Sequence, residues 1–248
     1  MTAPTFLLDL DNTLLTNDMN QFLPPYFALA QRRLEPLAQG TDLRQILVDS
    51  VQAALANQEL TVTNMTAFMA EFSRYLGYPA QTLQQILETF YRKDYPQLRQ
   101  YTGYRPEAPQ VVDHLLAKGY TVAIATNPLF PKSAIEQRLD WAGVGDFPYA
   151  HITTMENSHF SKPDPRYYQE ILGAVEAKPE STWMVGDNPT HDIVPAHKLG
   201  LKTWWITNQG NKAVESTMLP CDKHGSLADF LTWLETGQLV LQDGQPQS

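Results

Sequence analysis

The chain has 248 residues, of which 43% are hydrophobic and 18% charged, and this composition excludes a disordered chain and allows one large domain or two modest ones. The 27 acidic residues outnumber the 18 Lys and Arg, giving a formal charge of −9, the opposite of what a nucleic-acid-coating protein requires. A single cysteine, Cys221, precludes an internal disulfide, and neither a signal peptide nor an apolar run of about 20 residues is recognisable. These features predict a cytoplasmic globular protein with no membrane or nucleic-acid partner.

Short apolar runs predict strands that are buried on both faces. Each run is continuous rather than alternating, as in parallel strands that helices cover on both sides. The runs span residues 5–9, 120–125, 181–185 and 202–206, with a weaker one at 149–153. Helical patterns alternate with the later runs and span residues 107–118, 132–142, 165–177 and 189–199. This alternation predicts an α/β core with a parallel, Rossmann-like sheet.

The stretch between the first and second predicted strands has a different character. From about residue 14 to residue 100 the pattern contains no convincing strand. Helical patterns cover residues 26–38, 42–57, 64–76 and 80–95. We therefore expect two units, an α/β catalytic core made of residues 1–15 and 101–248 and a helical cap made of residues 16–100.

A pair of carboxylates directly follows the first predicted strand. In a parallel sheet, the carboxyl ends of the strands line the crevice where ligands bind. The segment Asp9-Leu-Asp11-Asn-Thr13 places two carboxylates one residue apart, and burying both is costly unless a cation lies between them. An Asp-Asn turn with helix-capping side chains is the alternative explanation for the same residues.

Three further segments carry a hydroxyl group, a lysine and more carboxylates. They are Thr126-Asn127, Ser161-Lys162-Pro163, and Gly186-Asp187 with Asp192. Taken alone, each also suits an ordinary turn, a solvated loop or a helix cap. Together with the first segment they place acids, a hydroxyl and a lysine in order at four strand ends. This combination favours a site that binds Mg²⁺ and a phosphoryl group.

The same four segments, in the same order, resemble the four motifs of the haloacid dehalogenase superfamily. That superfamily carries a helical cap straight after its first strand, where this chain has its helical insert. One departure is Phe160-Ser161, which stands where many members place a glycine before the lysine. The resemblance implies the superfamily's α/β fold and an enzyme that transfers a group to its own aspartate.

The resemblance also implies a role for each motif residue. Asp9 would be the nucleophile that becomes an aspartyl phosphate, and Asp11 would be the general acid and then the general base. The catalytic set is Asp9, Asp11, Thr126 and Lys162, and the phosphate-binding set is Asp11, Thr126, Asn127 and Lys162. The Mg²⁺ ligands would be Asp9, Asp187 and the main-chain carbonyl of Asp11. Thr13, Gly186 and Asp192 would support the site, with Asp192 orienting Lys162 or a metal-bound water.

Asp11 bears on which reaction is expected. The dehalogenating members that this chain resembles lack an acid at that position, because a leaving halide needs no proton whereas an alkoxide leaving from phosphate does. The expected function is therefore Mg²⁺-dependent hydrolysis of a small phosphorylated metabolite, such as a nucleotide or a sugar phosphate, through an aspartyl phosphate. A phosphomutase of the same fold stays open because it would share every motif. A 2-haloacid dehalogenase and a non-enzymatic phospho-acceptor or binding module are more distant alternatives.

Overall fold

The computed structural model describes residues 3–38, 40–207 and 220–237 of the chain. Within these ranges, six strands form one parallel sheet in the order β5-β4-β1-β6-β7-β8. Their bounds are β1 Thr5–Leu8, β4 Thr121–Ile124, β5 His151–Ile152, β6 Thr182–Gly186, β7 Lys202–Ile206 and β8 Lys223–Gly225. The predicted α/β fold with a parallel sheet is confirmed.

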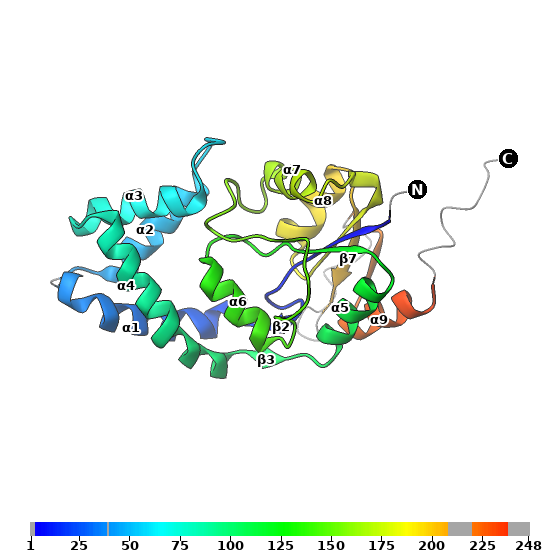
Figure 1. Ribbon diagram of the computed structural model, residues 1–248, viewed down its shortest axis with the longest axis horizontal. Coiled ribbons are helices and arrows are strands. Elements are labelled where there is room, and N and C mark those ends of the chain that lie inside the picture. The colour runs from blue at the N-terminus through cyan, green and yellow to red at the C-terminus, as the bar shows by residue number, and fades with distance from the viewer. Residues whose placement is uncertain (1–2, 39, 208–219, 238–248) are drawn as a thin grey trace.

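Helices cover both faces of this sheet (Figure 1). On one face lie α7 (Pro165–Ala174) and α8 (Val194–Lys198), and on the other lie α5 (Glu107–Ala117), α6 (Lys132–Trp141) and α9 (Leu227–Glu235). Successive side chains of β1 point to opposite faces of the sheet. Leu7 packs in the hydrophobic cluster with α7 and α8, whereas Phe6 and Leu8 pack in the cluster with α5 and α9. Burial on both faces explains why β1 is a continuous apolar run.

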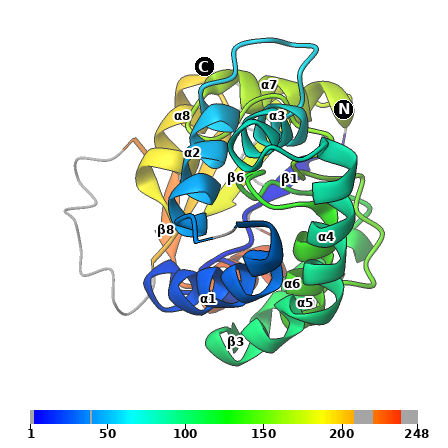
Figure 2. The ribbon, with the colours of Figure 1, turned by 90° about the vertical axis from the view of Figure 1, so that its left-hand side faces the viewer.

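A helical segment separates β1 from β4. Two short strands, β2 (Leu15–Thr16) and β3 (Gly103–Tyr104), pair antiparallel where the chain enters and leaves this segment, so the two crossings lie side by side. Between them the described residues form α1 Met19–Ala38, α2 Leu43–Leu55, α3 Asn64–Leu76, α4 Ala80–Lys93 and a 3₁₀ helix at Tyr95–Tyr101. Figures 1 and 2 show α1 to α4 gathered at one end of the molecule, beside the sheet.

Some predicted boundaries are wrong. Helix α1 begins at Met19 rather than at residue 26, and it continues through Pro24 and Pro25. Prolines remove helical hydrogen bonds, but Phe22 and Tyr26 lie one turn apart and are both buried, so packing outweighs that loss. The helix predicted over residues 189–199 is divided into a π-helical turn at Pro189–Ile193 and the short helix α8.

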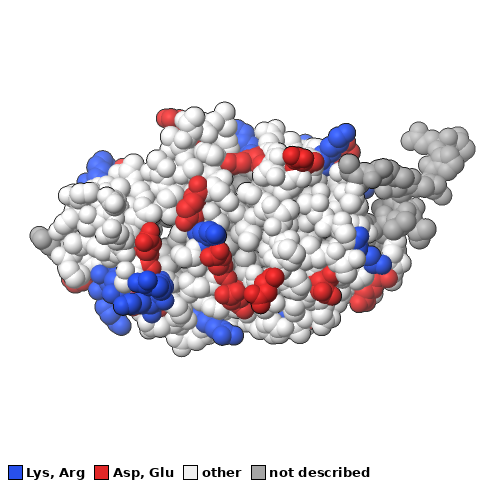
Figure 3. Space-filling model, in the orientation of Figure 1, with Lys and Arg blue, Asp and Glu red and all other residues white. Residues whose placement is uncertain are grey.

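Two properties of the surface follow from the described residues. None of the helices in the described ranges combines the length and the apolar character needed to cross a membrane. On the face seen in Figure 3, a band of acidic side chains runs near the middle of the molecule over α6, and a cluster of Lys and Arg lies beside it over α1 and α4. This band lies where the helical segment meets the sheet.

Candidate active site

Lys162 forms a buried ion pair at the end of the central strand. Asp9 directly follows β1, and its Oδ1 accepts a hydrogen bond from Lys162 Nζ at 2.8 Å. The other oxygen of Asp9, Oδ2, accepts a hydrogen bond from Thr13 Oγ1 at 3.0 Å. Lys162 Nζ also donates to Asp192 Oδ1 at 2.6 Å, and the lysine side chain is only 2% exposed. One ammonium group is therefore held between two carboxylates, away from solvent.

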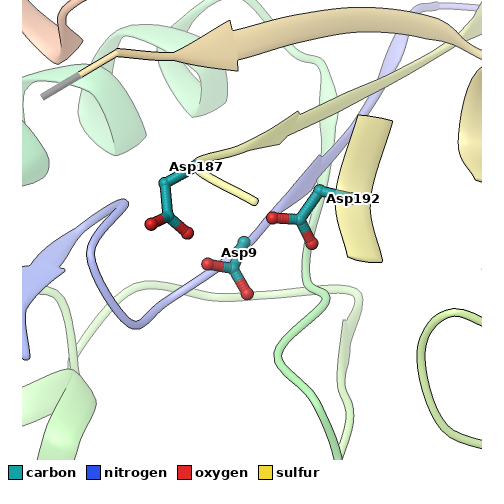
Figure 4. Close-up of side chains that lie close together, drawn as sticks. All are labelled: Asp9, Asp187 and Asp192. Carbon is teal, nitrogen blue, oxygen red and sulfur yellow. The ribbon is translucent and has the colours of Figure 1, made fainter. Parts of the chain in front are cut away.

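Three carboxylates converge beside this lysine (Figure 4). Asp9 follows β1, Asp187 follows β6 and Asp192 lies on the π-helical turn, and one oxygen of each lies within 4.8 Å of the others. Burial raises the pKa of Asp9 to about 7, although Lys162 opposes the shift. Burial, together with the charges of Asp9 and Asp192, raises the pKa of Asp187 to about 8. The raised pKa values thus reflect first the burial of these two carboxyl groups and then their repulsion from the neighbouring carboxylates.

The pKa of Lys162 moves in the opposite sense from what burial predicts. Burial alone would lower it, but the Asp192 and Asp9 carboxylates raise it well above its usual range. Lys162 is therefore a permanent positive charge in this site, suited to holding a phosphoryl oxygen and unsuited to proton transfer.

The oxygen donors of this cluster fit Mg²⁺, which prefers carboxylates together with water and phosphate oxygens. Both oxygens of Asp192 are already engaged, since Oδ1 accepts from Lys162 and Oδ2 accepts from the Asn188 backbone N–H at 3.0 Å. Within the described part of the chain, the Asp187 carboxylate has no hydrogen-bond partner. Both oxygens of Asp9 also accept hydrogen bonds, from Lys162 and Thr13, so Asp187 is the member of this cluster whose carboxylate is left open to a cation.

Gly186 allows Asp192 to reach Lys162. A Cβ atom at Gly186 would lie 2.3 Å from Asp192 Oδ2 and 2.4 Å from its Cγ, which is far too close for any side chain. The glycine is therefore required by the close approach of Asp192 to the end of β6.

Hydrogen bonds tie the second and third motifs together. Asn127 Oδ1 accepts from the Lys162 backbone N–H at 3.2 Å. The Thr126 carbonyl accepts from Thr153 Oγ1 at 2.7 Å and from the Tyr167 hydroxyl at 2.8 Å. These contacts fix the loop after β4 against the loop that carries Lys162. Thr153 and Tyr167 were not predicted to support the site.

Asp11 points away from the acid cluster and toward a buried arginine. Its Oδ1 accepts from Asn17 Nδ2 at 2.8 Å and its Oδ2 accepts from Arg138 Nη1 at 2.5 Å. The Arg138 side chain is 1% exposed, and its guanidinium lies 4.6 Å from the centre of the Phe130 ring. The prediction missed Arg138, although its sequence position gives a signal. It lies three residues after Ile135 on the buried face of α6, where a charged residue is unexpected.

The predicted site residues line one cavity of about 540 Å³ between the sheet and the helical segment. Those that face the cavity are Asp9, Asp11, Thr126, Asn127, Lys162, Asp187 and Asp192. Thr13 is fully buried behind Asp9, and Gly186 lies beneath Asp192. The opposite wall comes from α1 to α4. The motif residues, distant in sequence, are thus brought to one end of a single cavity.

The sequence matches the family of haloacid dehalogenase-like hydrolases over residues 3–200, and the chain belongs to this family. Among curated relatives, Pyrophosphatase PpaX of Bacillus cereus is 34% identical over 94 residues, which cover 38% of this chain and 42% of that protein. Phosphoserine phosphatase of Thermus thermophilus is 28% identical over 130 residues, covering 52% of this chain and 49% of that protein. The chain thus spans about half the length, or less, of these relatives.

Solved structures share the fold over nearly the whole chain. A HAD phosphatase from Thermococcus onnurineus matches with a TM-score of 0.59 and 18% identity, covering 93% of this chain and 97% of that chain. A 2-haloacid dehalogenase from Pseudomonas syringae pv. Tomato matches with a TM-score of 0.64 and 21% identity, covering 95% and 100%. At these identities the likeness concerns the fold, and it agrees with the family assignment.

Proposed function

We propose that this chain is a cytoplasmic, Mg²⁺-dependent phosphatase that hydrolyses a small phosphorylated metabolite through an aspartyl phosphate. The observation that carries the proposal is the buried Lys162 ammonium held between Asp9 and Asp192, with Asp187 beside them. Phosphoryl transfer depends mainly on positioning and on neutralising the phosphoryl charge, and this arrangement suits both tasks. The names of the two curated relatives, a pyrophosphatase and a phosphoserine phosphatase, support phosphoryl chemistry.

Asp9 is the proposed nucleophile. Its carboxylate oxygen attacks phosphorus, the bond to the leaving oxygen breaks, and the alcohol departs with a proton from Asp11. Water then cleaves the acyl phosphate while Asp11 accepts the proton. Lys162, Thr126 and Asn127 hold the phosphoryl oxygens during both steps. Mg²⁺, bound by Asp9, Asp187 and the Asp11 carbonyl, would add positive charge next to the same oxygens.

The contacts of Asp11 indicate what must change before this residue can act as the general acid. Both of its oxygens accept hydrogen bonds in this structure, so the acid role requires Asp11 to release Arg138 or Asn17 and take up a proton. Asn17 lies between β2 and α1, at the entrance to the helical segment. We propose that residues 16–100 act as a cap and that cap movement controls this release. The adjacent crossings β2 and β3 support a hinge at this place.

Phosphate release from p-nitrophenyl phosphate tests the proposal. We expect hydrolysis that requires Mg²⁺, that stops with EDTA and that is absent in Asp9→Asn. Thr66→Ala, an exposed change on α3, is a control for the effect of mutation itself, and its activity should equal that of the unmodified protein. Halide release from 2-chloropropionate without any phosphate release would contradict the proposal and would favour a dehalogenase.

A further inference from the structure

The part of the cavity remote from Lys162 is apolar. Helices α1 to α4 form this wall, which faces the strand ends across the cavity. The apolar side chains on this wall include Leu23 and Phe27 of α1, Leu47 and Val51 of α2, Met69 of α3 and Leu87 of α4. A phosphate ester bound at Lys162 would direct its alcohol part into this region. In that pose the apolar wall would contact the leaving group, and the strand ends would hold the phosphoryl group.

The polar groups on the same wall are few and carry no positive charge. The hydroxyl groups of Tyr26 and Tyr91 share one hydrogen bond, with their oxygens 2.9 Å apart, and the hydroxyl that accepts it keeps a neutral donor. The remaining polar side chains of the wall are Gln52, Gln84 and Glu88, and the last of these is acidic. A carboxylate here opposes the binding of an anionic leaving group.

Among the described residues that line the cavity, Lys and Arg side chains are confined to one place. Among the described residues, Lys162 is the only Lys or Arg that lines it, and two carboxylates already neutralise it. Arg138 lies close by but is fully buried and paired with Asp11. Outside the cavity, the acidic band over α6 lies beside a cluster of Lys and Arg over α1 and α4, so the surface there carries charge of both signs (Figure 3). A second anionic group directed at the α1–α4 wall, away from Lys162 and the proposed Mg²⁺ site, would thus find no Lys or Arg beside it among the described lining residues.

We propose that the substrate is a phosphomonoester of an uncharged and largely apolar alcohol, alkyl or aryl, rather than a phosphorylated acid or a diphosphate. This inference rests on the proposed phosphatase function and specifies its substrate class. A cavity of about 540 Å³ lies within the range of small-molecule sites and has room for a leaving group of several carbon atoms. Carboxylate- or phosphate-bearing leaving groups, as in phosphoserine or pyrophosphate, are disfavoured because charge desolvation on this wall has no compensation.

Matched substrates test the inference directly. We expect kcat/KM with Mg²⁺ to be about tenfold or more higher for phenyl phosphate than for 4-carboxyphenyl phosphate. The carboxylate makes the phenol no poorer as a leaving group, so the difference would report on binding to the wall. Along n-propyl to n-hexyl phosphate, kcat/KM should rise by up to about fourfold per methylene. Calorimetry with benzylphosphonate and 4-carboxybenzylphosphonate provides the same comparison without turnover.

A charge placed on the wall should reverse the preference. Gln52→Lys introduces a cation that faces the cavity, and we expect the ratio of kcat/KM for 4-carboxyphenyl over phenyl phosphate to rise at least fivefold, or about 1 kcal/mol. Gln45→Lys is the matched control, because Gln45 is an exposed glutamine of the same helix α2 outside the cavity lining. Its ratio should equal that of the unmodified protein.

The possible outcomes separate the two proposals. Hydrolysis of phenyl phosphate with equal or better hydrolysis of 4-carboxyphenyl phosphate would overturn the substrate class and leave the phosphatase intact. An unchanged ratio in Gln52→Lys would likewise overturn the role of the wall. Failure to hydrolyse any of these esters with Mg²⁺ would overturn the phosphatase and the substrate class together.

Discussion

Arg138→Met should destabilise the protein strongly, because it removes the buried cation that pairs with Asp11. The Arg138 side chain is 1% exposed and that of Asp11 is 20% exposed. Removing one partner of a buried ion pair typically costs about 3–5 kcal/mol. Since Asp11 keeps some solvent contact and its hydrogen bond from Asn17, we expect a loss near the lower end, about 3 kcal/mol. At about 2–4 °C per kcal/mol for a chain of this size, Tm should fall by about 6–12 °C.

Thermal and urea unfolding of matched variants measure this loss. Arg74→Met is the control, because Arg74 pairs with Glu71 at a similar distance but is 60% exposed, and its Tm should not change. In the described structure, Nε and Nη2 of Arg138 are buried without a hydrogen-bond partner, so the pair is itself expensive to bury. Adding Asp11→Asn to Arg138→Met should therefore recover part of the loss. A single Arg138→Met variant with the Tm of the unmodified protein would refute this reasoning.

Three further predictions concern the acid cluster. Gly186→Ala should lower kcat/KM for p-nitrophenyl phosphate at least about tenfold, because the added Cβ displaces Asp192; unchanged kinetics would contradict the close approach. Asp187→Ala should lose Mg²⁺ stimulation while keeping its circular dichroism spectrum, and undiminished activity at limiting Mg²⁺ would rule out Asp187 as a ligand. The native pKa values of Asp9 and Asp187, about 7 and about 8, lie above the unfolded value of 3.8, so the native state binds more protons between these limits. In EDTA, the free energy of unfolding should therefore fall as pH rises from about 4 to about 8. Thermal scans should also show that Mg²⁺ raises Tm more at pH 8 than at pH 5.5. A metal-free Tm that rises over this pH range would contradict the predicted direction of the change.

The sequence predicted four of the six strands of the described sheet well because those four are largely buried. β1, β4, β6 and β7 are short continuous apolar runs, and the polar motif after each of the first three is placed at the strand end by the topology. Strand β8, Lys223–Gly225, was missed because its three residues carry no apolar pattern. It exists through backbone pairing with the edge of β7.

The supporting contacts of the site were harder to predict because they depend on tertiary packing. The motif order indicated Asp9, Lys162 and Asp187, but no local pattern links Arg138 to Asp11, which is 127 residues away. The π-helical turn was also missed, since Pro189 and the residues after it read as an ordinary helix start. That wider turn carries Asp192, which reaches Lys162.

The central claim is that Asp9 accepts the phosphoryl group, and trapping that group in Asp11→Asn tests it most directly. p-Nitrophenolate leaves with little need of a proton, so the intermediate should still form in this variant. Loss of the general base slows its hydrolysis by about 10²- to 10⁴-fold, so the acyl phosphate should accumulate. Mass spectrometry of rapidly quenched protein should then find the phosphoryl group on the peptide that contains Asp9. Phosphorylation of a serine or of His191 instead, or continued turnover without any phosphorylated peptide, would contradict the account.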